Sequence, residues 1–233
     1  MRLFALLVVF SIGLMSPVPG FGETDIILAV PKFEPYTNIE NEEIQGRGGT
    51  LVKIVLDNME IRYSLKQVPN YGRAFKETEN GRADGFFLAT QNKERDNIAV
   101  FSEPVLFNRW SWFFTADRYM DPWTPNFKTT ALVGTALHTN TQLWLEKNGY
   151  QRINPILKFK KLPLLLTNKR LDAVFLSESV FLNSVSEAKL SSSRFKMKLQ
   201  EEKPFGIYIS KKFLKKNPGF MKQLNEAIRG AKQ

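Results

Sequence analysis

The sequence contains no cysteine and one histidine, His138. The absence of cysteine excludes disulfides, thiol nucleophiles, thiolate metal sites and lipid attachment at an N-terminal cysteine. A single histidine excludes a His-rich metal site, a Cys/His pair and a relay of several histidines. The GxSxG and P-loop motifs are also missing, so the common hydrolase and nucleotide-binding signals are absent. We therefore predict no catalytic residue, no metal and no cofactor.

The N-terminus has the pattern of a targeting signal. Met1 and Arg2 precede the apolar run 3–15, and prolines and glycines follow up to Gly22. This layout is typical of a secretory signal peptide, because a run of thirteen residues is shorter than the ~20 needed to span a bilayer. We expect residues 1–22 to be the signal peptide, with a free mature protein in the periplasm that carries no lipid anchor.

Positive charge is in excess, since 33 Lys plus Arg stand against 23 Asp plus Glu, a formal net charge of +10. Loss of Arg2 with the signal peptide leaves 32 against 23, or +9. Such an excess can attract anionic ligands, membranes or nucleic acids. The basic residues are spread along the chain apart from short clusters at 158–161 and 211–216, and a signal peptide argues against a nucleic-acid partner. We interpret the charge mainly as solvated surface.

Strand and helix patterns alternate along the chain, which predicts a largely parallel α/β architecture. Turn and proline signals at 116–126 indicate a boundary between two lobes. In the first part we expect strands at 25–30, 61–68, 85–89, 101–106 and 109–114, a helix with Thr50 as N-cap and another at 71–79. In the second part we expect strands at 130–136, 156–159, 171–176 and 205–210, helices at 139–147, 163–168 and from Asn217, and a helix end followed by a loop at 184–193.

One pattern occurs twice. Residues 80–88, NGRADGFFL, align with residues 168–176, NKRLDAVFL, so we expect a helix, a turn and a buried strand in two copies. The first copy opens onto a polar loop that carries Thr90 and Arg95. Open α/β sheets bind ligands beyond the carboxyl ends of their strands, so both side chains are expected to face a cleft.

Arg95 is the sharpest candidate for a ligand contact, because its planar guanidinium can grip a carboxylate with two parallel hydrogen bonds. The alternative is a structural ion pair with Glu94, Asp96 or Glu103. Thr90 is less specific, since a hydroxyl at a strand end binds a ligand or caps the following turn.

The helix that begins near Thr139 and Asn140 offers unpaired backbone amides and the positive end of its dipole to an anion. If Arg95 holds one side of a carboxylate and this helix holds the other, binding draws the lobes together. His138 lies just before the helix, and a lone histidine in a loop is more often structural than ligand-binding.

Aromatic side chains lie near the expected cleft. Phe33 and Tyr71 are placed to stack against a ligand. Trp110 and Trp112 are expected in the core, because burial of a large ring is the usual role of tryptophan.

Several short motifs follow one another in a set order. After the N-terminal signal come a strand, the loop FEPY at 33–36, a Gly-rich helix entry, the Arg73-Ala74 helix, GRADGFF at 81–87, NKER at 92–95 and FSEPV at 101–105. This order resembles the family 3 extracellular solute-binding proteins, and the resemblance covers essentially the whole mature chain. Those proteins serve ABC importers, many of them for polar amino acids.

The resemblance implies a fold and a set of partners. The implied fold is α/β, the type II periplasmic-binding-protein fold, in which two α/β lobes surround a hinge and a ligand cleft. Lobe 1 would comprise residues 23–114 plus 205–233, and lobe 2 residues 115–204. The implied partners are a small-molecule ligand with a carboxylate and an ABC permease or a membrane sensor, for a protein that is itself a monomer.

The resemblance also implies roles for individual residues. Arg95 matches the arginine that holds the ligand carboxylate, Thr90 matches a hydroxyl that touches the ligand, and Phe33 matches the aromatic ring that covers it. Thr139 and Asn140 match the helix entry that completes the carboxylate site.

Other positions depart from the family pattern. Tyr71, preceded by asparagine, stands where the closest subgroup has Pro-Trp, and Arg73 falls on that subgroup's arginine, to which we assign no role. The acid that holds the ligand ammonium in amino-acid binders falls on Ser177, with Glu178 one place along. Because neighbouring residues of a strand point to opposite faces, Glu178 is not an automatic substitute. The acid end of the ligand is therefore better predicted than the rest of it.

The main hypothesis is a periplasmic protein that closes on a small carboxylate-bearing solute, an amino acid or a related organic acid, for an ABC importer or a sensor. One alternative is a dehydratase-like periplasmic enzyme on the same fold, with Glu178 as general acid or base. Another is a protein that has lost small-molecule binding and acts through a protein partner. An occluded cleft filled with aromatic rings would favour the last alternative.

Overall fold

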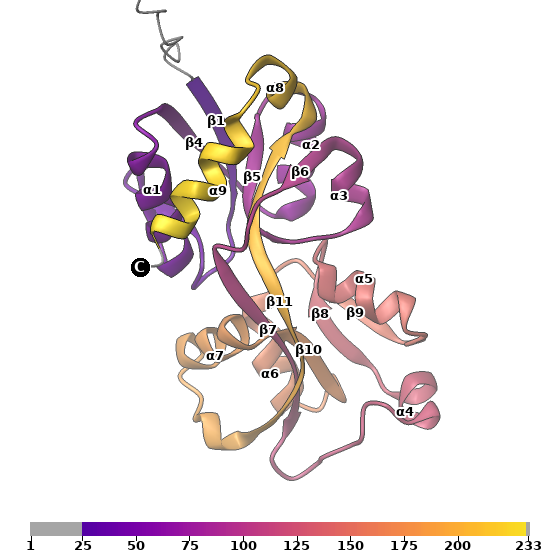
Figure 1. The fold of residues 1–233 in the computed structure, drawn as a ribbon. Helices are drawn as coiled ribbons and strands as arrows, with labels where there is room; N and C mark the ends of the chain where they lie inside the picture. Colours follow the sequence, from indigo (N-terminus) through magenta and orange to yellow (C-terminus); the bar gives the residue numbers. More distant parts are fainter. Residues whose placement is uncertain (1–24, 232–233) are drawn as a thin grey trace, which may run out of the picture.

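A computed structural model describes residues 25–231 (Figure 1). The predicted signal peptide, residues 1–22, lies outside this range. Within residues 25–231, no helix combines the length and the apolar character needed to cross a lipid bilayer.

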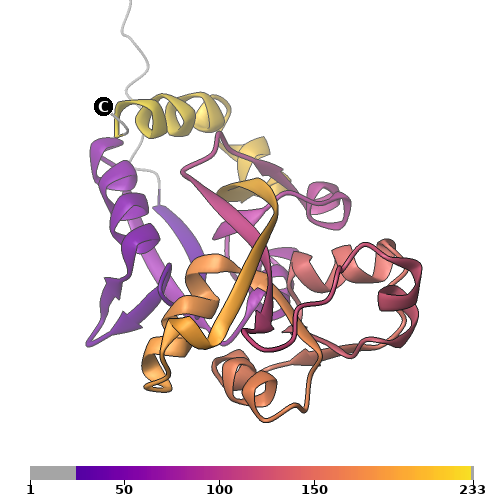
Figure 2. The same cartoon turned by 90° about the horizontal axis from the view of Figure 1, so that it is seen from below.

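The first lobe is built around three parallel strands, β1 (Asp25–Pro31), β4 (Arg62–Val68) and β5 (Gly85–Thr90). In Figure 1 the helix α1 (Arg47–Asn58) lies to the left of these strands, α9 (Phe220–Gly230) is drawn in front of them, and α2 (Tyr71–Glu79) and α3 (Lys93–Ile98) lie to their right. Buried apolar residues recur every three to four positions in α1 and α9, which contact each other, and Figure 2 shows α9 along the top edge of the lobe and α1 along its left edge. The remaining elements are β2 (Asn38–Glu40), β3 (Glu43–Gln45), β6 (Ala99–Phe101) and α8 (Lys211–Lys216).

The second lobe repeats the arrangement on a smaller scale. Its parallel strands are β8 (Val133–Ala136), β9 (Ile153–Ile156) and β10 (Ala173–Ser177). Its helices are α4 (Pro125–Thr130), α5 (Asn140–Lys147), α6 (Leu162–Thr167) and α7 (Glu178–Glu187). Trp112, as predicted, is a core residue here, and its fully buried ring contacts Phe127, Tyr150 and Phe175.

Two long antiparallel strands join the lobes, β7 (Leu106–Thr115) and β11 (Phe195–Ser210). They run through the centre of the molecule from one lobe into the other (Figure 1). Together they make one mixed sheet in the order β4-β1-β5-β11-β7-β10-β8-β9, with β6 paired to β11. The prediction of a largely parallel sheet is therefore wrong at the centre, where β7 and β11 pair antiparallel to their neighbours.

The strand β11 is the largest difference from the predicted elements. The sequence predicts a strand at 205–210 only, whereas the strand begins at Phe195. Its first ten residues, FKMKLQEEKP, are rich in lysine and glutamate, which are depleted in strands. They form a strand because they pair with β7 along its whole length.

The duplicated sequence pattern corresponds to a duplicated structure. Asp84, before β5, accepts a hydrogen bond of 2.9 Å from the backbone N–H of Ile27 at its Oδ2. Asp172, before β10, accepts one of 2.8 Å from the N–H of Leu132 in the same way. The turns before these aspartates hold Gly81 and Lys169 with φ of 72° and 56°, so the second copy places a lysine in the left-handed region that favours glycine.

Several predicted elements need correction. The strand expected at 101–106 is wrong, because Pro104 lies in the segment that separates β6 from β7. The strand expected at 156–159 is shifted, since β9 ends at Ile156 and Phe159 begins a 3₁₀ helix, Phe159–Lys161. The helix end expected within 184–193 is confirmed, since α7 ends at Glu187, but α4 and α8 were not predicted. The N-cap of α1 is Gly46, which has no side chain to cap with, and not Thr50.

Candidate functional site

Arg95 is buried where the first lobe meets the second. It lies in α3 and not on the predicted loop, because the side chain of Asn92 caps this short helix by accepting a 2.8 Å hydrogen bond from the N–H of Arg95. The guanidinium is 6% exposed and donates from Nη1 to the carbonyl of Thr90 at 2.7 Å. It also lies over the rings of Tyr71 and Phe86, at 5.3 and 5.7 Å from their centroids.

The described residues provide no carboxylate within ion-pair distance of Arg95. Of the three acids considered as alternatives, Glu103 pairs with Arg229 and Asp96 accepts a hydrogen bond from the hydroxyl of Tyr208. Burial lowers the pKa of Arg95 from its ordinary value, because desolvation disfavours the charged form. The charge is therefore held in the interior by one carbonyl and two aromatic faces.

Asn140 connects the second lobe to the end of β5. Its Nδ2 donates to the carbonyl oxygen of Thr90 at 2.9 Å and to the Thr90 hydroxyl at 2.5 Å, and its Oδ1 accepts from Nδ2 of Asn92 at 2.6 Å. Thr139 is the N-cap residue of α5, as predicted, but its hydroxyl donates to the carbonyl of Ala136 at 2.7 Å and makes no cap bond. The entry of α5 is thus fixed directly on the polar strand end of the first lobe.

A second group of contacts between the lobes involves the loop after β1. The ring of Phe33 meets Tyr71 at 5.2 Å and Phe159 of the second lobe at 5.6 Å, both edge to face. Next to it, Nζ of Lys160 pairs with Glu34 at 2.5 Å and with Glu187 at 2.9 Å. Aromatic rings and an ion pair therefore close the cleft in addition to Asn140.

These contacts leave an inner cavity of about 20 Å³. It brings together seven of the nine predicted ligand-binding residues, namely Phe33, Tyr71, Thr90, Arg95, Thr139, Asn140 and Ser177. A buried water needs about 10–15 Å³, whereas ligand pockets usually measure about 300–1,000 Å³. The cleft is closed in this structure to the size of a water molecule.

Two cavity residues carry buried polar atoms without a hydrogen-bond partner in the described part of the chain. They are Oδ1 of Asn108, on β7, and Oγ of Ser177, at the end of β10. Asn108 was not predicted to line the cleft. The sequence does carry a signal for it, because an amide stands two residues before Trp110 in a strand and therefore on the same face. Trp110 was expected in the core, and it is buried but also lines the cavity.

Glu178 and Arg73 lie apart from the inner cavity. Glu178 begins α7 and accepts a 2.8 Å hydrogen bond from Nε of Arg109. Arg73 reaches back along α2 to Glu77, one turn away, at 2.9 Å. A role for either residue in ligand binding stays a prediction.

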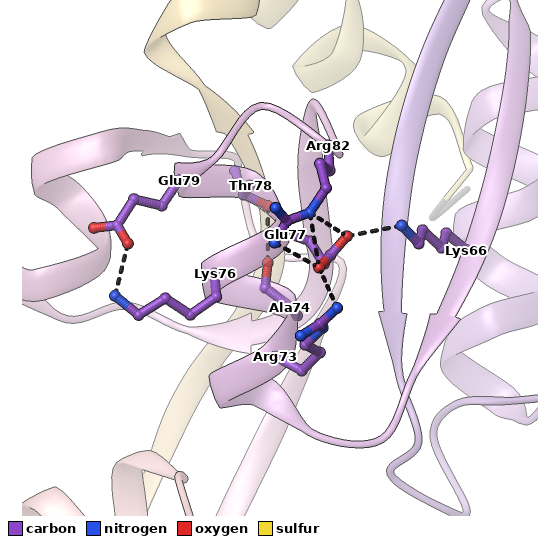
Figure 3. Close-up of polar contacts among 8 residues, drawn as sticks. All are labelled: Lys66, Arg73, Ala74, Lys76, Glu77, Thr78, Glu79 and Arg82. Atoms are coloured by element: carbon purple, nitrogen blue, oxygen red, sulfur yellow. Dashed lines mark hydrogen bonds and ion pairs between the residues drawn. The ribbon is translucent and has the colours of Figure 1, made fainter.

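Glu77 is the centre of a buried charge cluster (Figure 3). Its fully buried carboxylate meets Arg82 at 3.0 Å and Lys66 at 2.7 Å, as well as Arg73. Hydrogen bonds from Arg82 and Lys66 lower the pKa of Glu77 to about 2. The cluster fixes α2 on the edge of the first-lobe sheet.

A larger outer cavity of about 450 Å³ lies between α2, α3 and the entry of α5. Tyr71, Arg95 and Thr139 line both cavities. Among the described residues, no group of three or more His, Asp or Glu side chains is placed to hold a metal ion.

Known structures with this arrangement are numerous, although no protein-family model and no curated protein sequence matches the chain. A histidine kinase sensor domain with similarity to periplasmic binding proteins is 13% identical, with a TM-score of 0.76 over 89% of this chain and 90% of that one. The chain has a periplasmic-binding-protein fold. The type II fold expected from the motifs is confirmed.

Two further known structures are similar to this chain over most of their length. The GluR0 ligand-binding core from Nostoc punctiforme in complex with L-glutamate is 14% identical, with a TM-score of 0.73 over 89% of this chain and 92% of that chain. The substrate-binding protein of an amino acid ABC transporter is 16% identical, with a TM-score of 0.70 over 90% and 94%. At such identities the likeness establishes the binding-protein fold and leaves the ligand to be argued from the site.

Proposed function

We propose that the protein is a periplasmic solute-binding protein that closes on a small carboxylate-bearing solute, an amino acid or a related organic acid. The observation that carries this proposal is the buried guanidinium of Arg95, which has no carboxylate partner among the described residues. A buried cation is costly unless an anion meets it, so a carboxylate from solution is its natural complement. A guanidinium carries five N–H donors, and Arg95 uses one of them on Thr90, which leaves donors for a bidentate grip.

The rest of the proposal concerns how the protein works. We assign residues 23–114 plus 205–233 and residues 115–204 to the two lobes of a monomer, which open and close about β7 and β11. The solute passes to an ABC importer or is reported to a membrane sensor. Both uses occur among the similar structures, one of which belongs to an amino acid ABC transporter and another to a histidine kinase.

Thermal-shift and calorimetric titrations of the exported protein with a panel of amino and organic acids test this proposal. A solute that binds only the folded state stabilises it by RT ln(1+[L]/Kd), about 2.7 kcal/mol at a hundredfold excess over Kd. Arg95→Ala should abolish binding, and Arg95→Lys should weaken it, because an ammonium group lacks the fork geometry. Arg170→Ala removes an exposed positive charge outside both cavities and should bind as the wild type does. The proposal would be contradicted if no acid of the panel bound, or if Arg95→Ala bound an acid as tightly as the wild type does.

A second candidate is action through a protein partner with no small ligand. The observation in its favour is the cleft, which Asn140 and the rings of Phe33 and Phe159 reduce to about 20 Å³. In that case no acid of the panel binds, and a partner identified by proximity labelling in the periplasm binds Arg95→Ala as well as the wild type. The enzymatic alternative gains no support from the geometry, because no acid of the described residues lines the inner cavity and Glu178 is held by Arg109.

A further inference from the structure

Of the two cavities that Arg95 lines, the outer one is much the larger. The inner cavity measures about 20 Å³ and the outer cavity about 450 Å³, and Arg95 lines both. A ring with a short acid chain therefore fits the outer cavity without any movement of the lobes. The same molecule enters the inner cavity only after the contacts of Asn140 with Thr90 and Asn92 break.

The charges around the outer cavity single out Arg95. Two other cations in its lining are already paired with acids of α2, Arg73 with the buried Glu77 and Lys76 with Glu79. Arg95 is 6% exposed and has no acid partner in the described part of the chain. An anionic group that enters this cavity is therefore expected to seek Arg95.

The remaining walls are suited to an apolar body. Phe75 from α2 and Leu143 from α5 line the cavity together with the ring of Tyr71. The lining also holds one acid, Glu94, which disfavours a second carboxylate in this space. The chemistry thus favours a monocarboxylate over a dicarboxylate.

His138 forms part of the wall where the two lobes meet. Its backbone has φ of 60°, in the left-handed region, and its N–H donates to Oε1 of Gln142 at 3.0 Å. Its ring lies so close to Gly72 that a Cβ there would be 3.0 Å from Cγ of His138. The single histidine of the sequence therefore reports on this cavity.

We infer that the outer cavity is a binding site for a small monocarboxylate with an apolar, preferably aromatic, body. The carboxylate lies on Arg95 and the body lies against Phe75 and Leu143. This inference rests on the proposed function, in that Arg95 holds the carboxylate, but it places the ligand outside the closed cleft and not between Phe33 and Ser177.

Phenylacetate is a suitable probe, and NMR of the full exported protein can locate it. The ring protons of His138 report on the outer cavity, and the indole N–H of Trp110 reports on the inner one. We expect a saturable shift of the His138 signal with phenylacetate and none with phenethylamine, which has the ring but no carboxylate. The Trp110 indole signal should stay unchanged.

Paired substitutions complete the test. Leu143→Trp fills the outer cavity and should weaken phenylacetate binding by about tenfold or more. Leu164→Trp makes the same change at an exposed position of α6 and should have no effect. If Leu143→Trp does not fold, Phe75→Ala removes a wall of the cavity and should weaken binding severalfold while the His138 signal remains measurable.

The outcomes separate this inference from the proposed function. If phenylacetate shifts the Trp110 signal but not the His138 signal, and Leu143→Trp binds it as the wild type does, the outer site is wrong. The proposal that Arg95 binds the carboxylate is not contradicted by that result. If Arg95→Ala binds phenylacetate as tightly as the wild type does, the inference is also wrong. If no acid binds at either cavity, both the inference and the proposed function fall.

Discussion

The amide group of Asn140 donates hydrogen bonds to both the carbonyl and the hydroxyl oxygen of Thr90, fifty residues away in the other lobe. A side chain of the second lobe therefore occupies the polar strand end where the resemblance places the ligand. The closed form is held by the protein's own groups, and a ligand in the inner cleft has to displace them.

Removal of this contact should loosen the closed form. Asn140→Ala loses the bonds to Thr90 and to Asn92, so we expect the free energy of unfolding to fall by about 1–3 kcal/mol, because buried partners are left without a bond. Small-angle scattering should show a larger radius of gyration than that of the wild type. Asn126→Ala, which removes an exposed amide on α4, serves as the control. An unchanged scattering curve and stability for Asn140→Ala would contradict a closing role.

Substitution of the buried serines Ser177 and Ser210 by alanine should change the free energy of unfolding by different amounts. The buried Oγ of Ser177 has no hydrogen-bond partner among residues 25–231, so Ser177→Ala should leave the free energy of unfolding unchanged or raise it by up to about 1 kcal/mol. Ser210 accepts a hydrogen bond from the N–H of Phe213 as the N-cap of α8, so Ser210→Ala should cost about 0.5–2 kcal/mol. Urea denaturation measures both changes. Equal losses for the two variants would mean that Ser177 is satisfied in solution.

The pKa of Glu77 predicts an acid-dependent part of the stability. Arg82 and Lys66 lower this pKa from the ordinary 4.5 to about 2, so the folded state binds the proton less well than the unfolded state. The stabilisation is fully present above pH 4.5 and is lost as the pH falls towards 2. Glu77→Gln lacks the titrating group. The difference in free energy of unfolding between the wild type and this variant, measured by denaturation, should therefore shrink as the pH falls from 5 to 2.

Glu79→Gln provides the matched control for Glu77→Gln. Glu79 lies on the same helix but is partly exposed and pairs with Lys76 on the surface, so its substitution should have little effect at any pH. A difference between wild type and Glu77→Gln that does not shrink in acid would contradict the assignment to this carboxylate.

The ion pair of Lys160 should respond to salt. Lys160 joins Glu34 of the first lobe to Glu187 of the second, and all three side chains are partly exposed. Lys160→Met should therefore lower the unfolding free energy by about 1 kcal/mol or less in dilute buffer, with a smaller difference at 1 M salt, where screening acts over about 3 Å. A loss that is independent of salt would point to packing of the lysine stem and not to its charge.

The sequence allowed the polar ends of strands to be found because local signals mark them. Thr90, Arg95 and Ser177 follow buried apolar runs in the two copies of one pattern, and the structure brings all three to the inner cavity. The pair Arg73 and Glu77 was also accessible in principle, since residues four apart on a helix are neighbours.

Other features depended on contacts between distant parts of the chain. The charged strand 195–204 forms because β7 lies beside it, and neither strand alone indicates this pairing. The bond between Asn140 and Thr90 depends on how far the lobes close, which no local pattern encodes. Asn108 appears in the sequence only as an amide within an apolar strand, and its place in the cavity follows from the register of β7 with β10 and β11.

The paired strands β7 and β11 limit how the protein can move. Because the chain passes from one lobe to the other at these two strands, a change in lobe angle has to bend or twist a two-stranded ribbon. The register of β11 shifts between Leu199 and Glu201, and a bulge is where such a ribbon bends most readily. We therefore expect the proposed opening to concentrate its bending near this bulge, and fluorescence transfer between one dye in each lobe would measure the change.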